Sequence, residues 1–147
     1  MKIEQTVSFV LSRASTAFRN SLERNMGTIG LHSGQVFVLF ELWKKDGLRQ
    51  VDLAARLAVS TPTINKMILG LISSGLVTRT RLENDARSTR IFLTDAGAAL
   101  REPVESQWHE LEENTVAGLT EAERLILFEL LSKMKNLFTG TADDDES

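Results

Sequence analysis

The fold of this chain is decided between residues 48 and 100. The sequence there reads LRQVDLAARLAVSTPTINK over 48–66, GLVTR over 75–79, DARS over 85–88 and LTDAG over 93–97. The first segment predicts two short helices joined by a tight turn, and the next two predict a basic strand–loop–strand. Together they predict a winged helix-turn-helix, a fold that places one helix in the major groove of DNA and a charged loop beside it.

The second helix of this motif carries the positions that could face another molecule. The first helix is predicted over 51–58, with 58–60 as the turn, and either Ser60 or Thr61 caps the second helix. Pro62 fits its first turn, where the missing N–H costs nothing. Its core face is predicted from apolar residues at i, i+3, i+4 and i+7: Ile64, Met67, Ile68 and Leu71. Its outer face is predicted to carry Lys66, Leu69, Gly70 and Ser73, with Thr63 and Asn65 on the flanks.

A β-hairpin and a further helix are predicted after the motif. Two β-compatible runs lie at 76–80 and 89–93, and the polar segment between them, 81–88, is the expected wing. Thr94 is predicted to cap the next helix, and Pro103 inside that helix should kink or interrupt it. The expected fold class is therefore mainly α with a small β-hairpin.

Two more helices are predicted before the motif. Apolar residues at spacings of three and four predict an amphipathic helix over 3–25. Another helix is predicted over 33–45, with Ser33 as its N-cap. The DNA-binding lobe is expected to span 33–100.

The last predicted helix is the main evidence for a partner. The sequence TEAE at 120–123 is a capping box, and the helix that it opens is apolar on more than one face. A single small domain cannot cover that width, so we expect 1–30 and 103–139 to form a homodimer. The alternative is that these helices pack only on their own DNA-binding core. We expect one domain over 1–139, followed by a disordered acidic tail over 140–147.

The composition is that of a globular protein and excludes several kinds of site. Of the 147 residues, 42% are apolar and 25% are charged, as expected for one globular domain. There is no cysteine, which excludes disulfides, thiolate metal sites and thiol-based redox sensing. The two histidines, His32 and His109, lie far apart, so we expect neither a metal nor a cofactor. No apolar run approaches the roughly 20 residues of a membrane span and no signal peptide is evident, so a cytoplasmic protein without membrane contact is expected.

The charge is distributed unevenly along the chain. The net charge is −3, but residues 49–101 contain eight basic and four acidic side chains, and the remainder carries −7. A local basic surface, and not the global charge, is typical of a DNA-binding protein. The alternative interpretation is that these charges are scattered and merely solvated.

With these residues laid out, the chain resembles the MarR family of bacterial transcriptional regulators over nearly its whole length. The shared features are Leu53-Ala54 with Leu57, the step Gly75-Leu76-Val77, Asp85 with Arg87, and Leu93-Thr94 with Gly97. The resemblance implies a dimeric winged-helix protein that binds operator DNA and often represses its own or a neighbouring operon. It also implies release by a small ligand, frequently aromatic and anionic. The lack of cysteine removes the peroxide-sensing branch of the family.

The predicted recognition helix supplies the candidate base contacts. Asn65 could pair bidentately with adenine, and Lys66 could donate to guanine or to a phosphate, with Thr63 beside them. Leu69 and Gly70 depart from the family pattern, which usually has polar or charged residues there. Leu69 could touch a thymine methyl group, and Gly70 could allow close approach to a phosphate. The expected contacts to the DNA backbone are Gln50, Ser60 and Thr61.

The wing supplies the remaining candidate DNA contacts. Arg87 is the expected minor-groove or phosphate contact, and Asp85 could orient its guanidinium. Arg79, Arg81 and Arg90 would neutralise phosphates from the hairpin. For Arg90 an intramolecular salt bridge is the alternative. The expected partner is double-stranded DNA with a pseudo-palindromic operator, whose half-site centres lie about 10 bp apart.

A ligand site is predicted less directly, from the resemblance alone. The family's pockets lie between the dimer helices and the DNA-binding lobe, a region that here includes Arg13, Phe18, His32, Phe40 and Trp43. Arg13 or His32 could pair with a carboxylate, and Phe18 or Trp43 could stack on a ring. The simpler interpretation of His32 is a residue at a helix start with no ligand.

Two other classes of function are alternatives to a ligand-released repressor. A winged helix can serve protein–protein contact, or bind DNA constitutively without an effector, and this alternative stays open. An enzyme is not expected, because the sequence shows no nucleophile–base pair, metal cluster or phosphate-binding loop.

Overall fold

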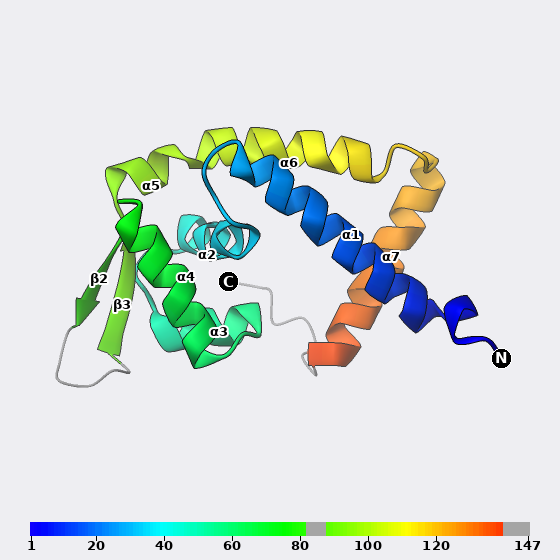
Figure 1. Ribbon diagram of the computed structural model, residues 1–147, viewed down its shortest axis with the longest axis horizontal. Coiled ribbons are helices and arrows are strands. Elements are labelled where there is room, and N and C mark those ends of the chain that lie inside the picture. The colour runs from blue at the N-terminus through cyan, green and yellow to red at the C-terminus, as the bar shows by residue number, and fades with distance from the viewer. Residues whose placement is uncertain (82–87, 140–147) are drawn as a thin grey trace. The chain divides into compact units, whose positions relative to one another are not determined.

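The computed structural model of the protein describes residues 1–81 and 88–139, and it is mainly helical with one small antiparallel sheet (Figure 1). This confirms the predicted fold class. In chain order the elements are η1 (Ile3–Gln5), α1 (Val7–Gly27), α2 (Ser33–Lys44), β1 (Leu48–Arg49), α3 (Gln50–Leu57), α4 (Thr61–Ser73), β2 (Val77–Arg81), β3 (Thr89–Leu93), α5 (Asp95–Ala99), α6 (Arg101–Thr115) and α7 (Glu121–Thr139).

Two compact units make up the chain, Met1–Leu111 and Glu112–Ser147. The first unit contains α1 to α5 and most of α6, and the second contains the end of α6 and α7. The single domain predicted over 1–139 stays a prediction, and the acidic tail at 140–147 lies outside the described residues. Within the described part of the chain, no helix is both long and apolar enough to span a membrane.

The sheet has three strands in the order β1–β3–β2, all antiparallel. β2 and β3 form the predicted hairpin, and the sheet has one further strand that the sequence pattern did not indicate. The third strand, β1, has only two residues, too few to show the alternating pattern of a strand. It pairs Leu48 with Ile91, and both side chains are buried. β1 therefore fastens the hairpin to the start of α3, which begins at the next residue, Gln50.

α2 forms the centre of the first unit, where α3 and α4 both pack against it. Its buried apolar residues are Val36, Val38, Leu39 and Leu42. α4 contributes the predicted stripe, of which Ile64, Ile68 and Leu71 are buried. The fourth residue, Met67, is half-buried and lies against Gly34 of α2, where a Cβ would come within 2.5 Å of its terminal methyl group. The glycine therefore allows α4 to approach α2 closely.

Three of the predicted helix caps are confirmed. Ser60, not Thr61, caps α4, and its hydroxyl accepts from the Thr63 N–H at 3.3 Å. The Thr94 hydroxyl accepts from the Gly97 N–H at 3.1 Å. At α7 the Thr120 N–H donates to the Glu123 carboxylate while the Glu123 N–H donates to the Thr120 hydroxyl. These hydrogen bonds satisfy backbone donors that a helix start leaves unpaired.

The prediction that Ser33 caps α2 is wrong. Ser33 is the first residue of α2 and His32 occupies the cap position. The Ser33 N–H donates to a carboxylate oxygen of Glu23 at 2.8 Å, and the His32 N–H donates to the Gln35 side chain at 3.0 Å. A carboxylate from α1 thus stabilises the α2 N-terminus, a long-range contact that the local sequence does not reveal.

The helix after the hairpin is interrupted as Pro103 predicted. α5 ends at Ala99 and α6 begins at Arg101, with Pro103 in the first turn of α6. Gly97 of α5 lies directly against the Leu76 carbonyl, where a Cβ would collide with backbone. Gly97 is therefore a close-packing site between α5 and the entry to β2.

An aromatic cluster packs between α1, α2 and α6. The ring of Trp108 meets Phe18, Phe37 and Phe40 edge-on, with centroid distances of 6.0, 6.1 and 5.2 Å. Trp43 extends the cluster from Phe40 at 5.8 Å. Edge-to-face rings at these distances attract beyond the effect of burial alone, so the cluster stabilises the packing of the three helices.

α7 has no buried residue, although it is rich in apolar side chains. Leu125 and Phe128 are 68% and 75% exposed, and Leu137 and Phe138 are more exposed still. The predicted apolar faces of this helix are therefore present, and their side chains are not buried within the unit that contains α7.

Candidate nucleic-acid interface

The start of α4 is held in a fixed geometry by the turn before it. Ala58 adopts a left-handed conformation, with φ of 52°, and so ends α3 abruptly. The Val59 N–H then donates to the Ala54 carbonyl at 3.0 Å, and Ser60 caps α4. The turn therefore sets the direction in which α4 leaves α3, as expected for a helix-turn-helix.

The outer face of α4 carries most of the predicted base contacts. Thr61, Thr63, Lys66 and Leu69 are exposed, and Asn65 is half-buried. The hydroxyl groups of Ser60 and Thr63 lie 2.9 Å apart, so these two side chains share one hydrogen bond at the helix start. The first three turns of α4 thus present hydroxyl, amide and ammonium groups to the outside.

The expectation that Gly70 faces outward is wrong. A Cβ at Gly70 would lie 2.6 Å from the side-chain nitrogen of Gln35, a buried polar residue of α2. Gly70 therefore faces α2 and leaves room for the end of the Gln35 side chain, so it does not point toward the outside as a DNA contact would. The sequence signal was ambiguous, because a glycine in a helix fits close approach to a neighbouring helix as well as to a phosphate.

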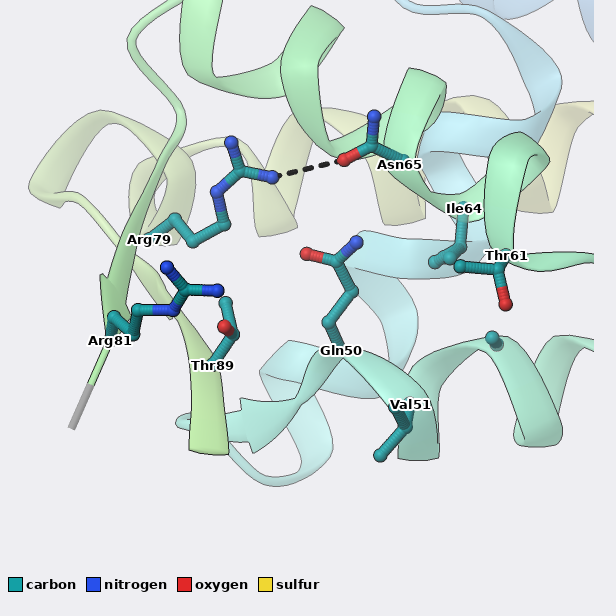
Figure 2. Close-up of a pocket in the computed structure, with 9 residues that line it drawn as sticks. Gln50, Val51, Thr61, Ile64, Asn65, Arg79, Arg81 and Thr89 are labelled. Carbon is teal, nitrogen blue, oxygen red and sulfur yellow. Dashed lines mark hydrogen bonds between the residues drawn. The ribbon is translucent and has the colours of Figure 1, made fainter. Parts of the chain in front are cut away.

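A hollow of about 430 Å³ lies between α3, α4 and the hairpin (Figure 2). The structure brings five predicted DNA contacts to it: Gln50, Thr61, Asn65, Arg79 and Arg81. Four lining residues were not predicted as site residues: Val51, Ala54, Ile64 and Thr89. Arg79 of β2 crosses to α4, where its Nη1 donates to the Asn65 side-chain oxygen at 3.1 Å. The hollow is thus lined by polar and cationic groups from three elements.

Arg90 does not stand free on the hairpin. Its Nη1 donates to the carbonyl of Gly47 at 2.9 Å, in a partly buried contact. An intramolecular partner was the alternative prediction, but the partner is a backbone carbonyl and not a carboxylate. Gly47 has a positive φ of 72° just before β1, so Arg90 fastens this turn to β3.

An acidic residue beside this face is neutralised by its neighbour. Arg49 donates to both carboxylate oxygens of Asp52, at 2.9 and 3.2 Å. Hydrogen bonding from Arg49 holds the pKa of Asp52 below its ordinary value, so the pair remains charged and internally balanced. A second pair, Arg56 with Glu41 at 3.1 Å, fastens α3 to α2. Among the described residues, Lys66 and Arg81 form no ion pair and keep their charge available for phosphates.

The tip of the wing lies outside the described residues. Asp85 and Arg87, predicted as the wing's DNA-contacting pair, both fall within 82–87. The described ends of the hairpin, Arg81 and Thr89, pair with each other across β2 and β3.

The predicted ligand residues are only partly brought together. Phe40 and Trp43 line a second hollow, of about 340 Å³, with Phe37, Glu41, Lys44, Leu57, Arg101 and Glu105. Trp43 also has a structural partner, since its indole N–H donates to the Gly97 carbonyl at 3.0 Å. Phe18 packs against Trp108 in the aromatic cluster and does not line this hollow.

The two predicted carboxylate-binding residues have partners within the protein. The guanidinium of Arg13 lies over the Phe9 ring, 5.1 Å from its centroid. Nδ1 of His32 lies 2.6 Å from a Glu23 carboxylate oxygen. Hydrogen bonds to the Glu23 carboxylate hold its pKa below the ordinary value, and the bond from the Ser33 N–H has a larger effect than the one from His32. This arrangement matches the simpler interpretation of His32 as a residue at a helix start. Within 1–81 and 88–139, no group of three or more potential ligands could hold a metal ion.

Comparisons with known proteins point to one family. A model of the MarR family matches residues 31–89. The HTH-type transcriptional regulator TtmR of Methylorubrum extorquens is 28% identical over 144 residues, covering 98% of this chain and 73% of that protein. The structure of Bordetella bronchiseptica BpsR, whose DNA binding is described as regulated by 6-hydroxynicotinic acid, is 25% identical with a TM-score of 0.82, and covers 92% of this chain and 97% of its own. The MepR chain in a Staphylococcus aureus MepR–DNA complex is 27% identical with a TM-score of 0.76, and the match covers 93% of this chain and 99% of the MepR chain.

Proposed function

The chain belongs to the MarR family of DNA-binding, winged-helix transcriptional regulators, and on that premise we propose that it is a homodimeric repressor released by a small ligand. One observation carries the proposal. A capped helix and a basic hairpin line the same hollow, and the polar side chains that line it are all neutral hydrogen-bonding or cationic groups, with no carboxylate among the lining residues (Figure 2). Such a surface is complementary to phosphates and base edges, and a relative of the same fold is described in complex with DNA.

The proposed contacts follow from the positions of the side chains. α4 enters the major groove, where Thr63, Asn65 and Lys66 meet base edges and Leu69 meets a thymine methyl group. Arg79 and Arg81 neutralise phosphates, and from the sequence alone, outside the described residues, we propose that Arg87 adds a minor-groove or phosphate contact and that Asp85 orients it. Contacts to the DNA backbone near the helix start come from Gln50, Ser60 and Thr61.

The homodimer is supported by α7. Its large apolar side chains are exposed along the whole helix, and monomeric proteins rarely expose a contiguous apolar patch of that extent. A second copy of the chain offers an identical apolar helix that could cover this patch. A two-fold axis would also duplicate α4, as a pseudo-palindromic operator requires. Half-site centres about 10 bp apart are expected.

The ligand site is proposed at the hollow beside the aromatic cluster. Phe40 and Trp43 line it with aromatic rings, Lys44 adds a positive charge, and Arg101 adds a second that is paired with Glu105 at 2.8 Å and would have to exchange that partner for the carboxylate of an aromatic acid. The regulation of BpsR by 6-hydroxynicotinic acid shows this class of effector in a protein of the same fold. The dimer could exist with its two α4 helices correctly or wrongly spaced for adjacent half-sites. A ligand that binds more tightly to the wrongly spaced conformation would lower the affinity of the dimer for the operator.

Selection of bound duplexes from a random library, repeated with candidate aromatic acids, tests this proposal. We expect an inverted repeat, a steep loss of affinity with salt, and weaker binding in the presence of the effector. An operator that is bound equally well with every acid tried would favour the constitutive alternative. A protein that is monomeric and binds no DNA duplex even at low salt would overturn the proposal.

A further inference from the structure

We infer that Arg79 is a positioning residue for Asn65, and that the two side chains together form a donor-only surface that selects guanine. The inference rests on the proposed function, because it assigns base selectivity within the same DNA-binding face. The two residues come from different elements, β2 and α4, and their side chains meet across the hollow (Figure 2).

The hydrogen bond between them decides which way the amide of Asn65 is turned. Arg79 Nη1 donates to the Asn65 oxygen at 3.1 Å. A guanidinium has five N–H donors and no acceptor, so only the oxygen of an amide can face it. Turning the amide by half a rotation would place its two N–H groups against a cation. Arg79 therefore holds the amide nitrogen of Asn65 pointing away from itself, as Figure 2 shows.

What remains for DNA is a set of donors. The Asn65 nitrogen has two N–H groups, and Arg79 keeps the N–H groups that it does not use on Asn65. The bidentate pair of asparagine with adenine needs the amide oxygen to accept from the adenine N6 amino group. Here one of the two lone pairs of that oxygen already accepts from Arg79, and the positive charge of the guanidinium beside it disfavours the approach of a second donor such as N6. Guanine offers two acceptors in the major groove, N7 and O6, and a donor-only pair satisfies both. The expected base therefore changes from adenine to guanine.

Arg81 provides a matched control on the same strand. It lies two residues after Arg79, lines the same hollow, and is exposed. Its side chain forms no hydrogen bond with the side chain of any other described residue. Removing Arg81 takes away one positive charge from the same place without touching the amide of Asn65.

The experiment measures the affinity of the full-length protein for operators that carry each of the four base pairs at every position. The variants are Asn65→Ala, Arg79→Ala, Arg81→Ala and the Asn65→Ala/Arg79→Ala double variant. We expect Asn65→Ala and Arg79→Ala to lower the preference for a G·C pair at the same position by about 5- to 100-fold. The double variant should lower it no further, because the two residues act as one unit. Arg81→Ala should weaken binding to all sequences and reduce the salt dependence by about one unit, leaving base preferences unchanged.

A further variant, Asn65→Asp, keeps an acceptor for Arg79 and removes the donor. It should lose the guanine preference and shift it toward cytosine, whose N4 amino group donates to a carboxylate. Guanine preference retained by Asn65→Asp would overturn the inference. So would an Arg79→Ala variant that loses affinity uniformly, since Arg79 would then contact phosphate only. Both of those results would leave the DNA-binding function intact, whereas wild-type protein that binds no duplex at low salt would defeat the proposed function itself.

Discussion

α4 and α7 are both rich in apolar side chains, yet α4 buries one face within the chain and α7 buries no residue. α4 buries Ile64, Ile68 and Leu71 against α2 and exposes a polar face. α7 buries nothing, and leaves side chains such as Phe128 three-quarters exposed. The difference shows that an apolar pattern specifies burial without specifying which chain supplies the covering surface. For α4 the cover lies within the same chain, and for α7 we propose that it lies in a second copy.

The largest expected effect comes from breaking the proposed cover of α7. Phe128→Asp places a charge in the apolar face, where burial without a partner is costly. We expect a monomer in sedimentation and operator binding about 10²- to 10⁴-fold weaker, because the two half-sites are no longer bound together. Glu129→Gln, an exposed neighbour on the same helix, should change neither quantity. A Phe128→Asp protein that remains dimeric would show that α7 is not at the interface.

Adjacent substitutions in α4 sharpen the same comparison within one helix. Ile68 is fully buried, and Ile68→Ala should lower the free energy of unfolding by about 2–5 kcal/mol through lost contacts and a residual cavity. Leu69 is 46% exposed, and Leu69→Ala should change stability by no more than about 0.5 kcal/mol. Urea denaturation measures both. Equal losses in the two variants would mean that the face of α4 is assigned incorrectly.

The two helix caps should respond differently although their chemistry is alike. Ser60→Ala should cost about 1 kcal/mol in the unfolding of the isolated protomer, because α4 is packed into its unit. Thr120→Ala removes the corresponding bond at α7, and its cost should appear mainly as weaker dimerisation. The comparison requires unfolding curves at several protein concentrations. A concentration-independent loss in Thr120→Ala would contradict the proposed role of α7.

The smallest effect is expected from pH, and it again separates the two regions. Hydrogen bonding from the Ser33 N–H and from His32 lowers the pKa of Glu23, and hydrogen bonding from the Thr120 N–H lowers that of Glu123. A lowered pKa means that the stabilisation is present above the ordinary value of 4.5 and is lost as pH falls through the folded value. Glu23→Gln should therefore flatten the acid dependence of protomer unfolding, and Glu123→Gln that of dimerisation. If the pH dependence of unfolding and of dimerisation were the same in both variants as in the wild type, these two carboxylates would not contribute to acid sensitivity.

The sequence was sufficient to predict features that depend on neighbours within one turn or one strand. The stripe on α4, the caps at Ser60, Thr94 and Thr120, and the interruption before Pro103 all arise from local spacing. The contacts that it could not predict join residues distant in the chain. Glu23 caps α2, Arg90 donates to Gly47, and the end of the Gln35 side chain lies against Gly70. Each of these depends on how two elements pack, which no periodicity encodes.

The candidate site divides along the same line. Residue types and spacing placed Asn65, Lys66 and the hairpin arginines on one face, and the structure brings Asn65 and two arginines to one hollow. The hydrogen bond from Arg79 to Asn65 was not predictable, because it needs the position of β2 relative to α4. In the proposed interface that single contact changes the expected base, so the specificity that we propose depends on tertiary structure as well as on the identity of the recognition-helix residues.

The aromatic cluster gives the protein a built-in optical reporter. The chain has two tryptophans and no tyrosine, and both indoles, Trp43 and Trp108, belong to this cluster and touch Phe40. Ultraviolet emission therefore originates from one place in the molecule, beside the hollow proposed for an aromatic acid. An unlabelled titration will quench or shift that emission when the indoles are disturbed, while substitutions on the outer face of α4 leave it as an unperturbed baseline.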